Sequence, residues 1–347
     1  MTVAAATERR RRAGSAAPII ELRGVSKQFR KTLDLAGRIA RRLGAKVREE
    51  VVHAVDSVDL AVRQGEVVGL VGESGCGKST LGRMVAGILP PSSGTILWKG
   101  QDVRTLPAEQ ARAAKLAVQM IFQDPYASLN PRLRVDRIIG EAPLVHGLVT
   151  RREFDAYLAQ QMRRAGLDPA FSRRYPHQFS GGQRQRIGIA RALAVQPEFI
   201  VCDEAVAALD VSIQAQILNL FMDLRRDLNL TYLFISHDLG VVEHLSDRVV
   251  IMYLGRIVEE APAGDVFASP NHPYTQALLT GVPRIDSRKR AFSAVKGEIP
   301  SPLDPPRGCH FHPRCPHAMA RCREEAPTLK EIAPGRRSAC HLNDARV

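Results

Sequence analysis

The chain has 347 residues and a formal net charge of +13, with 45% hydrophobic and 24% charged residues. This composition is that of a globular protein with ample apolar residues for a core, so it excludes disordered and fibrous classes. No stretch approaches the roughly 18 consecutive apolar residues of a membrane-spanning helix, and the start of the chain lacks the apolar region of a signal peptide. We therefore expect a protein that stays in the cytosol.

The excess of basic side chains lies at the two ends, residues 1–50 and 284–347, and the middle of the chain is nearly neutral. A uniformly basic domain would indicate nucleic-acid binding, whereas basic ends indicate solvated tails or local contact with anionic lipid or a partner. We interpret residues 1–18 as a disordered basic tail. The insert at residues 30–50 has the pattern of a basic, partly amphipathic helix, suited to a membrane surface, a partner groove or solvent.

Apolar runs between turn residues predict the regular elements in chain order. Strands are expected at residues 19–23, 52–62, 66–71, 199–202 and 232–235, and a helix at residues 79–89. Helical stretches precede the last two strands, and strands that alternate with helices predict a mainly parallel sheet covered on both faces. From about residue 284 the composition changes to Pro, Arg, Cys and His, and we place a boundary there.

A glycine-rich run separates the strand at residues 66–71 from the following helix. It satisfies the pattern G-x-x-x-x-G-K-[ST] in full, with Gly72, Glu73, Ser74, Gly75, Cys76, Gly77, Lys78, Ser79 and Thr80. The glycines let backbone N–H groups turn toward a phosphate, and the helix N-terminus adds positive potential. Lys78 is expected to reach the β- and γ-phosphates and Ser79 to ligate Mg²⁺, so the predicted ligand is a nucleoside triphosphate. The alternative is a structural turn.

Two acidic residues follow the apolar strand at residues 199–202. A site that hydrolyses nucleotides needs an acid that orients the metal and a group that aligns water. We expect Asp203 to hold Mg²⁺, directly or through water, and Glu204 to be the catalytic base for the attacking water. An acidic pair after a strand is also what a helix N-terminus carries, which is the alternative.

Between these motifs lies the signature-like run Phe179, Ser180, Gly181, Gly182 and Gln183. With the phosphate-binding pattern it resembles the LSGGQ signature of ABC ATPases, with Phe179 in place of Leu. The resemblance implies an α/β P-loop ATPase with a mainly parallel core sheet, an antiparallel β subdomain and a helical subdomain at about residues 124–182. It also implies a head-to-tail pair of subunits, with ATP between the phosphate loop of one and the signature of the other.

Four further residues resemble elements of the same family. Gln123 resembles the Q-loop glutamine, which contacts Mg²⁺ and the attacking water, and His237 resembles the switch histidine at the γ-phosphate. Asp210 resembles the D-loop aspartate of the run at residues 208–210, although Ala207 stands where the family commonly has Ser. Phe29 resembles the aromatic residue that stacks on adenine, with a core aromatic at a strand end as the alternative.

Two more runs point to one branch of the family. Residues 123–132 (QDPYASLNPR) and 271–275 (NHPYT) resemble the ATP-binding subunits of oligopeptide, dipeptide and nickel importers, in the form of the second (F-type) ATPase of the pair. The resemblance covers about residues 19–342. It implies that ATP hydrolysis with Mg²⁺ drives peptide import from a peripheral site on the cytoplasmic face of the membrane. The implied partners are a second, non-identical ATPase, two transmembrane permease subunits and an extracytoplasmic binding protein.

Four cysteines near the C-terminus, Cys309, Cys315, Cys322 and Cys340, lie in a Pro- and His-rich segment. Four thiolates suit a [4Fe-4S] cluster or a tetrahedral Zn²⁺ ion. The C-x2–4-C knuckle of most zinc sites is absent. The spacing resembles an iron–sulfur motif of some peptide-importer ATPases, so we predict a structural cluster, with zinc and unligated thiols as alternatives.

We therefore divide the chain into a tail (1–18), an ABC ATPase domain (19–283) and a C-terminal extension (284–347). The predicted function is ATP-driven peptide import. The alternatives are import of nickel or another solute by the same machinery, and a soluble ABC ATPase that acts on nucleic acid or the ribosome. The single ATPase unit and its neutral middle disfavour the last of these.

Overall fold

The computed structural model describes residues 17–31, 50–207, 209–281 and 297–346. Most of the predicted tail, most of the basic insert and Ala208 lie outside these ranges. In the described part of the chain, no helix has the length and apolarity to cross a membrane.

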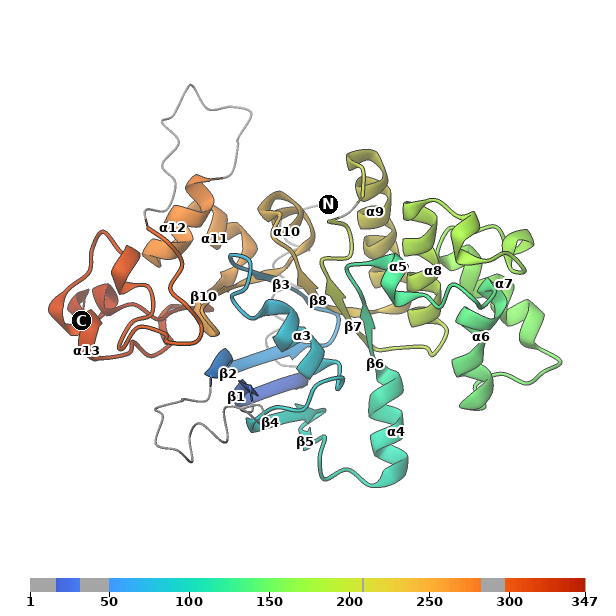
Figure 1. Cartoon of the computed structure of the whole chain (residues 1–347), viewed down its shortest axis with the longest axis horizontal. Helices are drawn as coiled ribbons and strands as arrows, with labels where there is room; N and C mark the ends of the chain where they lie inside the picture. The colour runs from blue at the N-terminus through green and yellow to red at the C-terminus, as the bar shows by residue number, and fades with distance from the viewer. Residues whose placement is uncertain (1–16, 32–49, 208, 282–296, 347) are drawn as a thin grey trace, which may run out of the picture.

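An eight-stranded sheet forms the centre of the molecule, in the order β11-β12-β10-β9-β3-β8-β7-β6 (Figure 1). Strands β6, β7, β8, β3 and β9 are parallel, and β10, β12 and β11 continue the sheet antiparallel. The strands are β3 (Val67–Val71), β6 (Val118–Ile121), β7 (Phe199–Asp203), β8 (Thr231–Ile235), β9 (Arg248–Tyr253), β10 (Arg256–Pro262), β11 (Lys330–Ala333) and β12 (Arg336–Ser338). The predicted mainly parallel core sheet is confirmed, and the C-terminal region extends it.

A separate antiparallel sheet, in the order β2-β1-β4-β5, lies below α3 in Figure 1. Its strands are β1 (Pro18–Lys31), β2 (Glu50–Arg63), β4 (Ser93–Trp98) and β5 (Gln101–Asp102). The first two are longer than the strands predicted at residues 19–23 and 52–62. They pair from Pro18 opposite Arg63 to Lys31 opposite Glu50, so the hydrogen-bonded ladder, rather than the apolar pattern, sets their ends.

Helices cover the central sheet and form a separate group at one side (Figure 1). The α-helices are α3 (Lys78–Val85), α4 (Ala108–Ala117), α5 (Pro125–Ser128), α6 (Val135–Val145), α7 (Phe154–Arg164), α8 (Gly181–Leu193), α9 (Val211–Leu228), α10 (Leu239–Leu245), α11 (Ala263–Ala268), α12 (Pro273–Thr280) and α13 (Ala320–Glu324). The 3-10 helices are η1 (Pro169–Phe171), η2 (Pro176–Gln178), η3 (His312–Arg314) and η4 (His341–Arg346). Helices α5 to α8 form the helical subdomain, at the right of the figure.

Two apolar clusters pack on opposite faces of the central sheet. Val67 and Val71 of β3 join a cluster with α6, α8, α9 and α10, whereas Val68 and Leu70 join one with α3 and the antiparallel sheet. This alternation is the two-residue period of a strand. Strands β3, β7 and β8 are buried along their whole length and are mostly apolar, as expected of parallel strands covered on both faces.

A buried ion-pair network fixes the start of β9. The guanidinium of Arg248 binds Glu66 at 2.7 Å and also Glu260 of β10, and all three side chains are only 10–12% exposed. The network joins the segment before β3 to β9 and β10. It therefore stabilises the strand order on which the site depends.

Candidate active site

The phosphate-binding loop connects β3 to α3. Gly77 is the N-cap of α3 with φ of +107°, and a Cβ there would lie 2.1 Å from the carbonyl oxygen of Ala54, so only glycine fits. Lys78 is 5% exposed, and its Nζ donates to the carbonyl oxygens of Gly72 (2.7 Å) and Glu73 (3.0 Å). The loop thus curls around a buried ammonium at a helix N-terminus, which is the arrangement that binds phosphate.

Ser79 and Asp203 meet at the carboxyl edge of the parallel sheet. The Ser79 Oγ donates to Asp203 Oδ1 at 2.7 Å. Burial raises the pKa of Asp203, and the hydrogen bond from Ser79 acts in the opposite direction. Hydroxyl and carboxylate oxygens are ligands that suit Mg²⁺ beside a bound phosphate, so the two residues fit the predicted metal.

Two side chains that follow neighbouring strands converge on one carboxylate oxygen of Glu204. Gln123 Nε2 donates to Glu204 Oε2 at 2.9 Å, and His237 Nδ1 lies 3.3 Å from the same oxygen. Gln123, Glu204 and His237 follow β6, β7 and β8, which are adjacent in the sheet. The Glu204 N–H donates to the carbonyl oxygen of Ile235, and its φ of +47° is unusual for a residue other than glycine. The carboxylate is therefore held in place between two polar side chains.

The signature lies on a different helix from the phosphate loop. Ser180 is the N-cap of α8 and forms a capping box with Gln183, through bonds of 3.0 and 3.3 Å. A Cβ on Gly182 would lie 2.5 Å from Ile213 of α9, which explains a glycine there, whereas a Cβ on Gly181 would meet nothing within 4 Å. The backbone at the start of α8 is thus open to an incoming group.

Asp210 and Phe29 also lie outside this group of contacting residues. Asp210 is the N-cap of α9 without a side-chain capping bond, and the next residue, Val211, is 84% exposed. Phe29 lies on β1 with 42% exposure, and Lys27 Nζ is 5.4 Å from its ring centroid. Both roles remain predictions.

Sequence reasoning missed two residues that contact the phosphate loop. Arg314 binds the carboxylate of Glu73, and the Tyr274 hydroxyl accepts from the Glu73 N–H. Tyr274 stands in the run at residues 271–275, which carried a resemblance but no assigned role. Nothing in the sequence around Arg314 points to a partner 241 residues away.

The four C-terminal cysteines line one small pocket together with Phe311 and several histidines. Burial raises the pKa of the Cys309 and Cys315 thiols, and that of Cys340 to about 11. Among the described residues, no three His, Cys, Asp or Glu side chains are placed to hold a metal ion. The arrangement thus gives no support for the expected iron–sulfur cluster or zinc ion, because its thiols share a pocket without meeting at a common point.

These observations divide the chemistry between two surfaces. One carries the phosphate loop and the Glu204 carboxylate with its two polar partners, and the other carries the N-terminus of α8 with the signature residues. This division, on a P-loop sheet with an antiparallel and a helical subdomain, defines the ATP-binding cassettes, the ATPases of ABC transporters.

Comparison with known proteins identifies the branch. Residues 55–207 match the ABC transporter family, and residues 258–322 match the oligopeptide/dipeptide transporter C-terminal region. The chain is 51% identical over 328 residues to the oligopeptide transport ATP-binding protein AppF of Bacillus subtilis strain 168, covering 93% of this chain and 97% of the relative. It is 50% identical over 298 residues to a probable peptide ABC transporter ATP-binding protein of Sinorhizobium fredii, covering 86% and 84%.

Solved structures share the fold. A dimeric ATP-binding cassette in a post-hydrolysis state, bound to ADP and Pi, matches with a TM-score of 0.58 and 26% identity over 70% of this chain and 98% of that one. The cbiO1 protein of Clostridium perfringens matches with a TM-score of 0.59 and 24% identity over 73% and 92%. The chain therefore belongs to the ABC transporter ATPases of the oligopeptide/dipeptide branch.

Proposed function

We propose that this chain hydrolyses ATP to drive the import of di- or oligopeptides, as one of two ATPase subunits on the cytoplasmic face of the membrane. The observation that carries the proposal is the Glu204 carboxylate, held by Gln123 and His237 beside a complete phosphate loop, in a chain that also has the oligopeptide/dipeptide C-terminal region. The relatives from Bacillus subtilis and Sinorhizobium fredii are named as peptide transport ATP-binding proteins, which indicates the substrate class. Import of nickel or another solute is the alternative.

The residues of the site take distinct roles in hydrolysis. Lys78 and the N–H groups at the start of α3 bind the phosphates, and Ser79, Asp203 and Gln123 would hold a Mg²⁺ ion, which would supply positive charge to the phosphate oxygens. Glu204 orients the attacking water and accepts its proton as the new bond to the γ-phosphorus forms and the bond to the ADP oxygen breaks. His237, beside Glu204, donates to the γ-phosphate.

A second subunit completes the site. Glycine at position 181 leaves the start of α8 open, and Asp210 and Val211 are exposed nearby on α9. In the pair, Ser180 to Gln183 bind the γ-phosphate held by the partner, through the N-terminus of α8. An exposed valine beside this surface fits an interface that ATP closes and hydrolysis opens.

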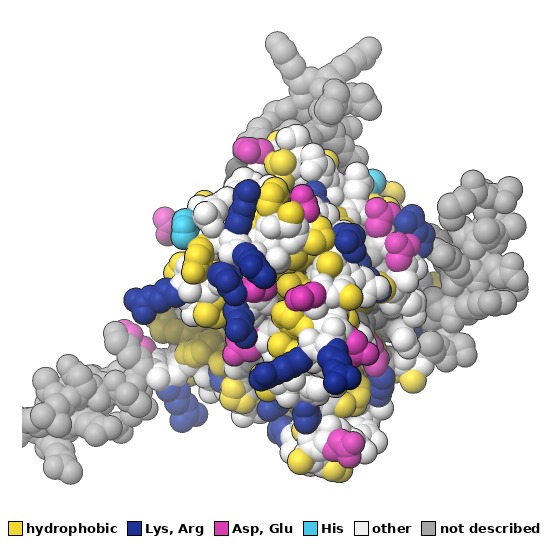
Figure 2. Space-filling view, turned by 90° about the vertical axis from the view of Figure 1, so that its right-hand side faces the viewer, with side chains coloured by type: hydrophobic (Ala, Val, Ile, Leu, Met, Phe, Trp, Pro, Cys, Tyr) yellow, Lys and Arg dark blue, Asp and Glu magenta, His cyan; other side chains and the backbone are white. Residues whose placement is uncertain are grey.

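The helical subdomain presents the surface for the permease subunits. Four large apolar side chains are exposed on it, Tyr126 (64%), Val145 (71%), Leu148 (37%) and Tyr175 (39%). Figure 2 shows this side of the molecule, where Lys and Arg side chains alternate with apolar patches. Apolar anchors within a polar rim are typical of protein interfaces.

We also propose that Cys309, Cys315, Cys322 and Cys340 hold a [4Fe-4S] cluster with a structural role. What supports the proposal is that the four thiols line one pocket and that their spacing lacks the C-x2–4-C knuckle of most zinc sites. Zinc stays the alternative.

The decisive experiment is uptake of a labelled tripeptide by cells that carry Glu204→Gln at the native locus, with expression matched to wild type. A matched control is Glu109→Gln, an exposed glutamate of α4. Loss of uptake only in Glu204→Gln supports ATP-driven peptide import through this subunit. Normal tripeptide uptake in Glu204→Gln cells would contradict it, and lost nickel uptake in the same cells would establish the alternative.

A further inference from the structure

Two residues of the C-terminal region, Arg314 and Tyr274, form hydrogen bonds with Glu73 of the phosphate loop. Arg314 Nη1 lies 2.7 Å from Glu73 Oε2 and Nη2 lies 3.0 Å from Oε1, a two-point contact. The Glu73 N–H donates to the hydroxyl of Tyr274 at 2.9 Å, and its carbonyl oxygen accepts from Lys78. Side chain, amide and carbonyl are thus all fixed, and two of the three partners come from the region at residues 258–322.

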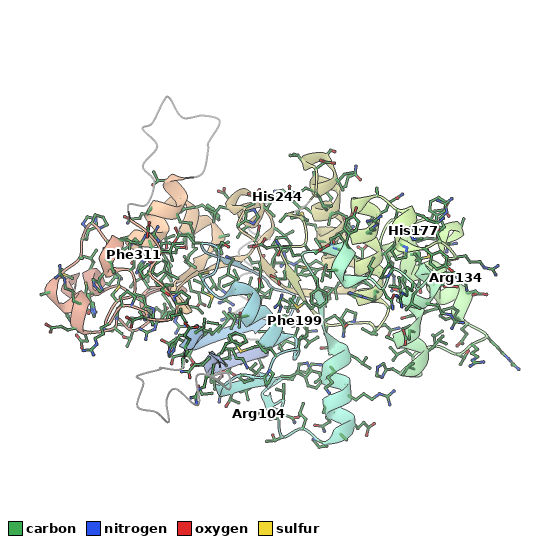
Figure 3. The ribbon with its side chains drawn as sticks, viewed as in Figure 1. Arg104, Arg134, His177, Phe199, His244 and Phe311 are labelled. Carbon is green, nitrogen blue, oxygen red and sulfur yellow. The ribbon has the colours of Figure 1, made fainter. Side chains whose placement is uncertain are left out.

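The arginine that makes this contact is itself firmly placed. Its side chain is 5% exposed and belongs to η3, directly after the buried Phe311. The Phe311 ring packs on Tyr253 and Tyr274, with ring centroids 5.3 and 5.4 Å apart, and Figure 3 shows it in the C-terminal region. Arg314 lies over the ring of Tyr253, at 5.9 Å from its centroid. A planar guanidinium held this way fixes both the direction and the distance of the carboxylate.

The negative charge of Glu73 matters for nucleotide binding. A nucleoside triphosphate is strongly anionic, and Glu73 places a carboxylate within the loop that must receive it. Arg314 neutralises that carboxylate, and Glu73 is largely removed from solvent, at 22% exposure. Without Arg314, a partly desolvated negative charge would remain unpaired beside the phosphates, and the loop would lose an anchor.

We propose that Arg314 is a positioning residue for ATP binding, which acts by neutralising Glu73 and holding the phosphate loop in its binding conformation. Tyr274 has the same role at the loop backbone. The C-terminal region therefore contributes to nucleotide affinity by holding the phosphate loop. This inference concerns nucleotide affinity and is independent of which solute the transporter carries.

The test is titration of the purified full-length chain with Mg²⁺ and a fluorescent ATP analogue. Arg314→Ala is expected to raise Kd about tenfold, which corresponds to about 1.4 kcal/mol. Arg314→Lys should give a smaller rise, because an ammonium cannot make the two-point contact, and Tyr274→Phe should also weaken binding while keeping its ring in place. Arg337→Ala is the matched control, since that arginine of β12 pairs with Glu260 and no contact between it and the phosphate loop is seen among the described residues; its Kd should equal that of wild type.

A double variant separates positioning from a general structural effect. If Arg314 acts through Glu73, then Glu73→Gln/Arg314→Ala should bind ATP more tightly than Arg314→Ala, because the unpaired charge is gone. A double variant as weak as the sum of the two single changes would overturn the proposal. So would a wild-type Kd in folded Arg314→Ala. Should Arg314→Ala fail to fold by near-UV circular dichroism, wild-type Kd values in both Arg314→Lys and Tyr274→Phe would overturn it, and raised values would support it.

Discussion

The Glu204→Gln substitution tests the assignment of the catalytic base. Glutamine has the same shape, and its side-chain oxygen can still accept from Gln123, which lies 2.9 Å from the carboxylate. The binding contacts of Lys78 and Ser79 are untouched, so nucleotide affinity should not fall. Only the proton acceptor is lost, and general base catalysis contributes typically about 10²–10⁴ in rate. At 1.36 kcal/mol per factor of ten, the barrier should rise by about 3–5 kcal/mol.

The assay is phosphate release by the assembled transporter with wild-type or Glu204→Gln subunits, with light scattering to follow the pair of ATPases. Turnover at the altered site should fall by the stated factor, and the variant should accumulate as an ATP-bound pair, because ATP closes the interface and hydrolysis no longer opens it. Glu109→Gln should behave like wild type. Normal phosphate release by the Glu204→Gln complex would refute the assignment.

Three other predictions concern the phosphate loop, the buried ion pairs of Arg248 and the C-terminal cysteines. Lys78→Ala should abolish nucleotide binding, measured by the same titration, because the buried ammonium both shapes the loop and meets the phosphates. Arg248→Ala should lower the free energy of unfolding by about 3 kcal/mol in urea, since it leaves the buried carboxylate of Glu66 without a charged partner and that of Glu260 with Arg337 alone, whereas Arg226→Ala at an exposed pair should leave the urea midpoint unchanged. Anaerobic purification should yield about four iron and four sulfide per chain, from the four cysteines of a cubane cluster; stoichiometric zinc instead would favour the alternative.

Local patterns were sufficient to predict the phosphate loop and the buried strands. The run from Gly72 to Thr80 matches a phosphate-binding pattern in full, so it predicts nucleotide binding without any knowledge of the fold. The bounds of β3, β7 and β8 lie within two residues of the predicted strands. Local patterns were not sufficient to predict that Gln123, Glu204 and His237 lie together. The sequence places Glu204 and His237 after predicted strands, and the family resemblance gave Gln123 and His237 separate roles, but only the order β6-β7-β8 in the structure makes the three residues neighbours.

The contacts of the C-terminal region could not be predicted, because they depend on long-range packing. Arg314 stands in a segment without helical or strand periodicity, and its partner Glu73 is 241 residues earlier. Likewise, β12 continues the central sheet through pairs between Glu259 and Ser338 and between Glu260 and Arg337, although β11 and β12 are short and polar. Nothing in such strands marks which edge they will extend.

The four-residue helix α5 connects the catalytic carboxylate with the signature helix. Gln123, two residues before α5, donates to Glu204, while Tyr126 within α5 lies against the guanidinium of Arg184, 3.9 Å from its ring centroid. Arg191 donates to the last carbonyl oxygen of α5. Both arginines belong to α8, whose N-terminus carries the signature. Under the docking proposed above, a shift of the exposed Tyr126 would be passed both to Gln123 and to the helix whose N-terminus carries the signature.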